Sequence, residues 1–271
     1  MVNFITDAPP APMSLNHARL SNGVTLHFAA QGPKTGPAVV LLHGFTDSWF
    51  SFSRVLPLLP VDMRVIAPDM RGHGDSERPP LGYRLADLAG DVLRLMDAQQ
   101  IPKAVLVGHC MGSFVARKVY ELAPGRVSRL VLAGAGAAMQ TPVMTGLMHM
   151  INWLTDPVDE AFVREFQMSC VHGPVPQPFM EAIIANSRRM PARIWKDVMQ
   201  GLLEGEINLS RPDVRTLVVG GRQDAVFSVP EQMALARQFP RGELHLIDGV
   251  GHSLHWEQPA TFVSALARFG V

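Results

Sequence analysis

The chain has 271 residues, of which 47% are hydrophobic and 18% are charged. This balance is typical of a folded enzyme and leaves little room for disorder. Lysine plus arginine and aspartate plus glutamate number 24 each, so the formal net charge is zero. Neither nucleic acid nor an anionic membrane surface is therefore expected as a partner. The two cysteines, Cys110 and Cys170, are too few for a disulfide framework.

No stretch has the length and apolar character of a membrane span, and the N-terminus lacks the basic start and apolar centre of a signal peptide. We therefore expect a cytoplasmic protein. Residues 1–16 are rich in proline and are expected to form an extended arm.

Apolar runs and helical patterns alternate along most of the chain. Asn22-Gly23 suits a tight hairpin turn, so an antiparallel pair over 17–21 and 24–30 is expected to open the sheet. Further strands are expected at 38–42, 63–67, 104–107, 130–133, 216–220 and 243–247. Helices are expected at about 51–59, 84–99, 111–123, 230–239 and 256–269. This pattern predicts an α/β fold with a mostly parallel, doubly wound sheet.

The alternation stops between residues 136 and 211, where amphipathic stretches are joined by proline-rich linkers such as 173–178. Methionine is frequent there: Met139, Met144, Met148, Met150, Met168, Met180, Met190 and Met199. Because methionine fills irregular apolar gaps, these residues suggest an adaptable apolar pocket lining.

One pentapeptide, Gly108-His109-Cys110-Met111-Gly112, stands where an apolar run ends and a helical pattern begins. Glycines on both sides of Cys110 allow strand and helix to approach closely, so Cys110 can adopt a strained backbone and point outward. A helix N-terminus favours negative charge, which suits a cysteine acting as a thiolate nucleophile.

This pentapeptide resembles the nucleophile elbow of the α/β-hydrolase family, whose usual form is G-x-S-x-G. The resemblance extends over nearly the whole chain from about residue 17. It implies an α/β-hydrolase core formed by residues 1–135 and 212–271 and a helical cap formed by residues 136–211. Two explanations fit the cysteine: a natural Cys-His-Asp enzyme, as among the dienelactone hydrolases, or a serine esterase in which cysteine replaces the serine.

The family presents nucleophile, acid and histidine in that chain order. Asp224 stands in a turn that resembles the family's acid turn, and His252 in a loop that resembles its histidine loop. The resemblance therefore implies a triad of Cys110, Asp224 and His252. Asp248 is a weaker alternative acid, and His255 is expected to be structural.

The family also builds an oxyanion hole from two backbone N–H groups. The matching residues here are Met111, after the nucleophile, and Phe45, in His43-Gly44-Phe45. His43 is expected to be a structural hydrogen-bonding residue. The stretch from Asp69 to Ser76 resembles a family turn and is expected to be structural too.

Relatives that open epoxides or displace halide carry an aspartate nucleophile and usually proline after H-G-x, whereas this chain has Cys110 and Thr46. The resemblance therefore implies a carboxylic-ester hydrolase or acyltransferase that forms an acyl-enzyme on Cys110, with small to medium hydrophobic acyl or aryl esters as substrates. Alternatives are a lactonase, a carbon–carbon bond hydrolase, a hydroxynitrile lyase, a perhydrolase, or a ligand receptor with slow turnover. No motif for a metal or nucleotide cofactor occurs, so none is expected. Candidate pocket residues are Trp49, Met144, Met148, Trp153 and Trp195.

Overall fold

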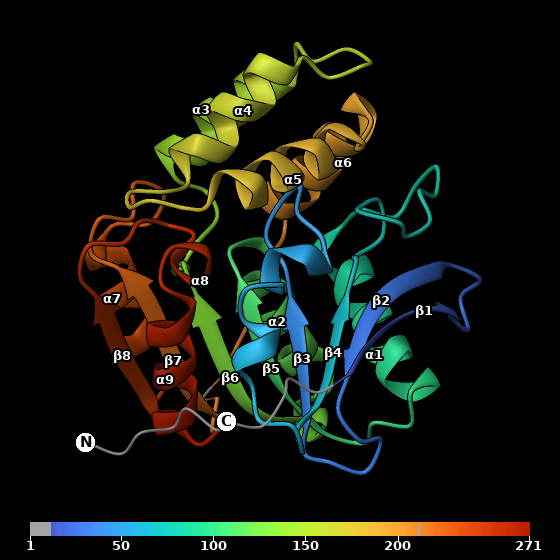
Figure 1. Ribbon diagram of the computed structural model, residues 1–271, viewed down its shortest axis with the longest axis vertical. Helices are drawn as coiled ribbons and strands as arrows, with labels where there is room; N and C mark the ends of the chain where they lie inside the picture. Colours follow the sequence, from blue (N-terminus) through green and yellow to red (C-terminus); the bar gives the residue numbers. More distant parts are fainter. Residues whose placement is uncertain (1–11, 211) are drawn as a thin grey trace.

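The computed structural model describes residues 12–210 and 212–271, and in them an eight-stranded sheet has the order β1-β2-β4-β3-β5-β6-β7-β8 (Figure 1). The strands are β1 (Met13–Arg19), β2 (Thr25–Gln31), β3 (Ala38–Leu42), β4 (Arg64–Pro68), β5 (Ala104–His109), β6 (Val127–Ala133), β7 (Arg215–Gly221) and β8 (Gly242–Ile247). β2 is antiparallel to β1 and β4, whereas the pairs from β4 to β8 are parallel. The predicted α/β class with a mostly parallel sheet is confirmed.

Both faces of the sheet are covered, which explains why its central strands are apolar without interruption. Val40 and Leu42 of β3 pack toward one hydrophobic core, and Val39 and Leu41 pack toward a second core on the opposite face. The first core includes α1 (Leu85–Ala98), α2 (Met111–Leu122) and α7 (Val229–Arg237). The second includes α9 (Pro259–Phe269).

Two predicted helices are wrong in detail. The segment 51–59 forms only two 3₁₀ turns, Trp49–Phe52 and Leu56–Leu58, because Pro57 and Pro60 lack the N–H that a longer helix requires. The last helix is divided into α8 (Leu254–Glu257) and α9, since Pro259 begins a new helix.

The predicted arm is also corrected at its end. β1 begins at Met13 and pairs with β2, so the arm does not extend to residue 16. Residues 1–11, which make up most of the predicted arm, lie outside the described residues.

Four helices connect β6 to β7: α3 (Pro142–Ile151), α4 (Glu160–Ser169), α5 (Gln177–Arg188) and α6 (Ala192–Leu203). Figure 1 shows them gathered above the end of the sheet where the parallel strands terminate. We call these four helices the cap; the division of the chain into separate core and cap domains stays a prediction. None of the helices described here is long and apolar enough to cross a membrane.

Arg117 of α2 holds the segment that leads into the cap. Its guanidinium, which is almost fully buried, donates hydrogen bonds to the carbonyl oxygens of Gly136 and Ala137, both at 3.1 Å. The guanidinium carbon lies 4.2 Å from the ring centre of Phe114. Burial lowers the pKa of Arg117 to about 9. Carbonyl dipoles and an aromatic face thus receive this buried cation.

Candidate active site

Cys110 occupies a sharp turn between β5 and α2, with φ 48° and ψ −114°. A side chain on either neighbouring glycine would collide with backbone: a Cβ on Gly112 would lie 2.1 Å from the Leu42 carbonyl oxygen, and one on Gly108 would lie 2.2 Å from the Gly112 carbonyl oxygen. The Cys110 N–H donates to the carbonyl oxygen of Ala133 at 3.0 Å. These contacts hold a strained residue in place, and Cys110 lines a cavity between core and cap.

His252 and Asp224 come together at the same cavity from two loops that follow β8 and β7. His252 Nδ1 lies 3.0 Å from Asp224 Oδ2, and both side chains are almost fully buried. The other carboxylate oxygen, Oδ1, accepts the backbone N–H groups of Val226 (2.8 Å) and Phe227 (3.0 Å). Asp224 therefore presents Oδ2 to His252 in a fixed orientation.

The pKa of His252 is shifted in the opposite direction from those of the other buried histidines around the site. These are His43, His73, His109 and His255. Burial and neighbouring positive charge lower the pKa of His109 to about 3, and burial lowers the pKa of His73 to about 4. His43 and His255 are lowered in pKa as well, chiefly by burial. Burial also lowers the pKa of His252, but the charges of Asp224 and Cys110 and hydrogen bonds to both raise it well above the usual value. Among these five, His252 alone is suited to hold a proton near neutral pH.

Asp248, the alternative acid, and His255, the second histidine of the loop, do not line the cavity. Asp248 is exposed and pairs with Arg222 at 2.6 Å. His255 Nε2 lies 2.9 Å from Ser51 Oγ, which also accepts the Trp256 indole N–H at 2.9 Å. His255 thus has a structural partner.

The loop after β3 is oriented by His43. Its Nε2 accepts the backbone N–H of Met70 at 2.9 Å, so its Nδ1 carries the proton and donates to the Gly44 carbonyl oxygen at 2.7 Å. That carbonyl belongs to the same peptide group as the N–H of Phe45, and in a trans peptide the two point in opposite directions. Across the described parts of the chain, neither the Phe45 N–H nor the Met111 N–H has a protein acceptor.

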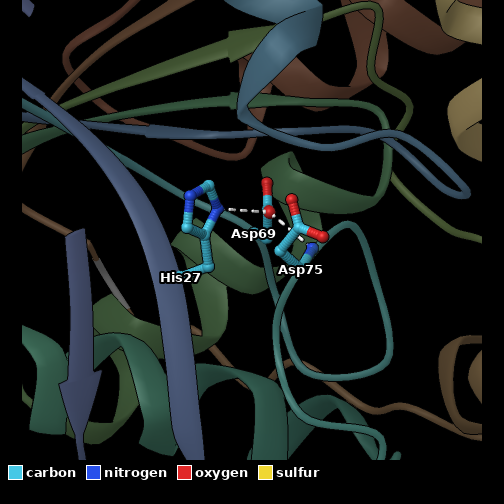
Figure 2. A group of neighbouring side chains, drawn as sticks. All are labelled: His27, Asp69 and Asp75. Atoms are coloured by element: carbon cyan, nitrogen blue, oxygen red, sulfur yellow. Dashed lines mark hydrogen bonds and ion pairs between the residues drawn. The ribbon is translucent and has the colours of Figure 1, made fainter. Parts of the chain in front are cut away.

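The turn after β4 is organised by Asp69, as Figure 2 shows for His27, Asp69 and Asp75. Asp69 Oδ2 accepts from His27 Nδ1 at 2.8 Å and from the Asp75 N–H at 2.9 Å, while Oδ1 accepts from the Trp49 N–H at 2.7 Å. His27, Asp69 and Asp75 offer atoms within 4.8 Å of one another, a spacing that metal ligands also have. Because three protein donors already use the Asp69 carboxylate, we assign the group to the turn.

The cavity has a volume of about 270 Å³. Its wall is mostly apolar and includes Phe45, Met139, Val143, Met144, Leu147, Met150, Phe162, Phe166, Met199, Val226 and Trp256. The polar and sulfur-containing groups beside Cys110 and His252 are Asp47, His109, Glu165, Gln167, Ser169, Cys170 and Ser253. Half of the eight cap methionines singled out in the sequence therefore reach the wall.

Of the five predicted pocket residues, only Met144 lines this cavity. Trp153 follows the end of α3 and is 86% exposed. Trp195 is buried behind the wall, where its ring packs 5.3 Å from that of Phe45 and its Nε1 donates to the Met190 carbonyl oxygen. Trp49 and Met148 are partly buried against the two cores. These four assignments are corrected.

Asp47 was missed by the sequence reasoning, although it lies two residues after Phe45. It is 3% exposed and receives hydrogen bonds from Ser51 Oγ (3.3 Å) and Gln167 Nε2 (3.4 Å). Burial raises the pKa of Asp47 to about 7, against the opposing effect of these donors and of His252.

The raised pKa of Asp47 has a consequence for stability. Between about pH 4 and pH 7 the folded protein keeps this proton while the unfolded chain releases it, so folding loses stability as pH rises through this window. An asparagine cannot ionise. We expect the free energy of unfolding of Asp47→Asn, relative to that of the unmodified protein, to increase by up to about 4 kcal/mol from pH 4 to pH 8.

Chemical denaturation at both pH values measures this difference. Asp248→Asn, which removes an exposed carboxylate, is the matched control. A difference between Asp47→Asn and the unmodified protein that is independent of pH would contradict the prediction.

The comparisons agree with this fold. The family described as the alpha/beta hydrolase fold matches residues 37–168. The 2-hydroxymuconate semialdehyde hydrolase of Pseudomonas sp. (strain CF600) is 28% identical over 280 residues, covering 97% of this chain and 96% of the relative. The soluble epoxide hydrolase of Corynebacterium sp. (strain C12) is also 28% identical over 280 residues, covering 94% of this chain and 96% of the relative.

A solved structure of a thermophilic esterase from Thermogutta terrifontis superposes with a TM-score of 0.83 at 24% identity, covering 94% of this chain and 97% of that one. The order of the strands, the turn at Cys110 and these matches lead to one assignment. The chain has the α/β-hydrolase fold.

Proposed function

We propose that this protein is a carboxylic-ester hydrolase or acyltransferase that works through a thioester on Cys110. One observation carries the proposal: Cys110, in the strained turn at the start of α2, and His252, held at Nδ1 by Asp224, line the same apolar cavity. A nucleophile, a base and a group that orients the base are what covalent acyl transfer requires.

In the proposed reaction the Cys110 thiolate attacks the acyl carbon and forms the carbon–sulfur bond. The carbonyl oxygen becomes an oxyanion that accepts hydrogen bonds from the backbone N–H groups of Phe45 and Met111. The carbon–oxygen bond to the leaving alcohol then breaks, and His252 gives that oxygen its proton. Water or a second alcohol next attacks the thioester, His252 takes the proton of the attacking group, and the thiolate leaves. A lactone would follow the same steps with its leaving alcohol still attached.

The chemistry of sulfur argues against epoxide opening, the activity named for several relatives. A thiolate that opens an epoxide forms a thioether, which water does not cleave, so the enzyme would stop after one event. A thiolate that attacks an acyl carbon forms a thioester, which water hydrolyses. Cys110 can therefore turn over only at an acyl carbon.

The charge of the cavity argues for an uncharged acyl group. No lysine or arginine lines the cavity among the described residues, and Asp47 and Glu165 both do. A substrate carboxylate buried there would have no lysine or arginine as a partner and would be costly to desolvate. This feature favours neutral esters over anionic substrates of carbon–carbon bond hydrolases.

The proposal is tested with p-nitrophenyl acetate and butyrate. We expect many turnovers per Cys110, and rapid acid quenching should trap one acyl group on the peptide that contains Cys110. Release of a single equivalent of p-nitrophenol followed by a stall would instead identify a slow ligand receptor. Methanol added as acceptor separates transfer from hydrolysis.

A Cys110→Ser variant is expected to retain turnover, because every other group of the site is unchanged and the intermediate becomes an ester in place of a thioester. A hydrolysis rate many times higher than that of the cysteine protein would identify a site built for serine. Loss of turnover would identify a site that requires a thiolate. Steady-state rates of the two purified proteins give the answer.

A further inference from the structure

Thr46, the residue after Phe45, has a backbone conformation that its side chain disfavours. Its φ is 67°, in the left-handed region, where a β-branched residue is a marked outlier. Its side chain is buried, with 2% of the residue exposed. Such strain persists only where the surroundings hold it in place.

The cap supplies the contacts that hold Thr46. Gln167 Nε2 of α4 donates to Thr46 Oγ1 at 3.0 Å. The Ser187 hydroxyl of α5 shares its single proton between the Thr46 carbonyl oxygen at 3.2 Å and the Ile183 carbonyl oxygen at 3.0 Å. The two hydrogens of Gln167 Nε2 are shared among three acceptors, since Ser187 Oγ lies at 2.8 Å and Asp47 Oδ1 at 3.4 Å beside Thr46 Oγ1. We call these hydrogen bonds from Gln167 and Ser187 the cap–loop contact.

Both cap residues are buried, so their polar groups are costly unless they are paired. Gln167 lines a cavity whose wall is mostly apolar, and its amide points at polar groups of Thr46, Asp47 and Ser187. The groups that the Gln167 amide binds lie in the loop after β3 and in α5, so its role concerns the link between these two elements.

The same loop carries the Phe45 N–H. His43 fixes one end of this region by donating to the Gly44 carbonyl oxygen. The cap–loop contact fixes the other end at Thr46, only one residue beyond Phe45. The direction of the Phe45 N–H thus depends on one contact made within the core and one contact made by the cap.

We propose that Gln167 is a positioning residue, which keeps Thr46 left-handed so that the Phe45 N–H points at the oxyanion, and that the oxyanion hole is complete only while α4 is docked. This inference rests on the proposed function, since it assigns a cap residue to the acylation step. The cap then contributes to the chemistry as well as to the walls of the cavity.

The test replaces Gln167 with methionine, which removes both N–H donors and keeps the length of the side chain. Because a misdirected donor weakens binding of the transition state more than binding of the ester, we expect kcat for p-nitrophenyl butyrate to fall about ten- to a hundredfold and KM to change less than about threefold. Iodoacetamide reacts with Cys110 at a saturated carbon and forms no oxyanion. Its rate is expected to change less than about twofold, as only thiolate character controls it.

The matched control is Arg164→Met on the same helix. Arg164 is partly exposed and joins α4 to α5 through Glu181 at 2.7 Å, without contacting Thr46. This variant is expected to retain kcat and the alkylation rate. A loss of kcat equal to that of Gln167→Met would show that general loosening of α4 is responsible and would overturn the proposal.

A second background tests the role of strain. Glycine adopts a φ of 67° at little cost, so Thr46→Gly removes the need for the cap–loop contact. In this background we expect Gln167→Met to lower kcat less than about threefold, a coupling that a double-mutant cycle measures. An equal loss in both backgrounds, or a parallel loss of alkylation, would overturn the proposal.

Binding of butyraldehyde to Cys110 tests the positioning role of Gln167 without requiring ester turnover. The aldehyde forms a hemithioacetal with a thiolate, and the oxygen of the adduct occupies the oxyanion hole. Protection of Cys110 from iodoacetamide gives its affinity, which we expect Gln167→Met to weaken about tenfold. Absent ester turnover with intact protection by butyraldehyde would refute the proposed function alone, and unchanged protection in Gln167→Met would refute the positioning role.

Discussion

Replacing Cys110 with alanine is expected to lower kcat for p-nitrophenyl butyrate by at least about a thousandfold. The variant keeps the turn, the cavity and the Asp224–His252 pair, so only the attacking atom is lost. Any remaining hydrolysis would come from water held beside the oxyanion hole. Steady-state release of p-nitrophenol measures the effect, and thermal unfolding establishes that the fold is retained.

Cys170→Ala provides the matched control for that experiment, because Cys170 is a buried thiol that lines the same cavity. Burial raises the pKa of Cys170 to about 12, so this thiol stays protonated and is a poor nucleophile. Cys170→Ala is expected to retain most of the activity. Combining Cys110→Ala with His252→Ala is expected to cost no more than either change alone, since the two residues act as a unit. Substantial activity in Cys110→Ala would exclude the acyl-enzyme.

Asp224→Asn is expected to lower kcat by about ten-thousandfold, through the tautomer of His252. Asp224 accepts two backbone N–H groups on Oδ1 and the Nδ1 proton of His252 on Oδ2. An asparagine that keeps its oxygen toward the backbone turns its NH₂ toward His252. Nδ1 must then accept, which leaves the proton on the nitrogen that should act as base.

The pH dependence gives Asp224→Asn a second readout. Asp224 and Cys110 together raise the pKa of His252 well above its usual value, and the variant removes one of these two charges. Alkylation of Cys110 by iodoacetamide, followed from pH 5 to pH 10, is expected to require a higher pH in the variant, because a neutral His252 no longer stabilises the thiolate. Asp248→Asn is the control. An unchanged alkylation profile together with full activity would show that Asp224 does not orient the base.

The sequence predicts best what is local. The turn at Cys110, the acid turn at Asp224 and the loop at His252 are each short stretches that follow a strand, and parallel strands bring their ends to one edge of a sheet. The positions of the central strands could be predicted from uninterrupted apolar runs, because both faces of the sheet are covered. The errors at 51–59 and near Gln258 arose where proline divides a helical pattern into shorter pieces.

The cavity wall was poorly predicted because it depends on how helices meet. Met144 and Trp153 stand nine positions apart, one near the start of α3 and the other just after its end, yet the first lines the cavity and the second is exposed. Gln167 and Asp47 are 120 positions apart and form a contact that no motif marks. Large aromatic side chains suit a pocket and a core equally well, so composition could not decide the place of Trp195.

The contacts of Arg117 with the segment that leads into the cap differ from other attachments of the cap in their response to ionic strength. Arg117 binds neutral carbonyl groups in a buried setting, and salt screens such contacts little. On another side of the cap, Arg189 pairs with Asp75 of the core where both side chains are half exposed, and salt weakens pairs of that kind. Rising salt concentration therefore weakens the Arg189–Asp75 pair and leaves the Arg117 contacts largely unchanged, so ionic strength acts unequally on these two attachments.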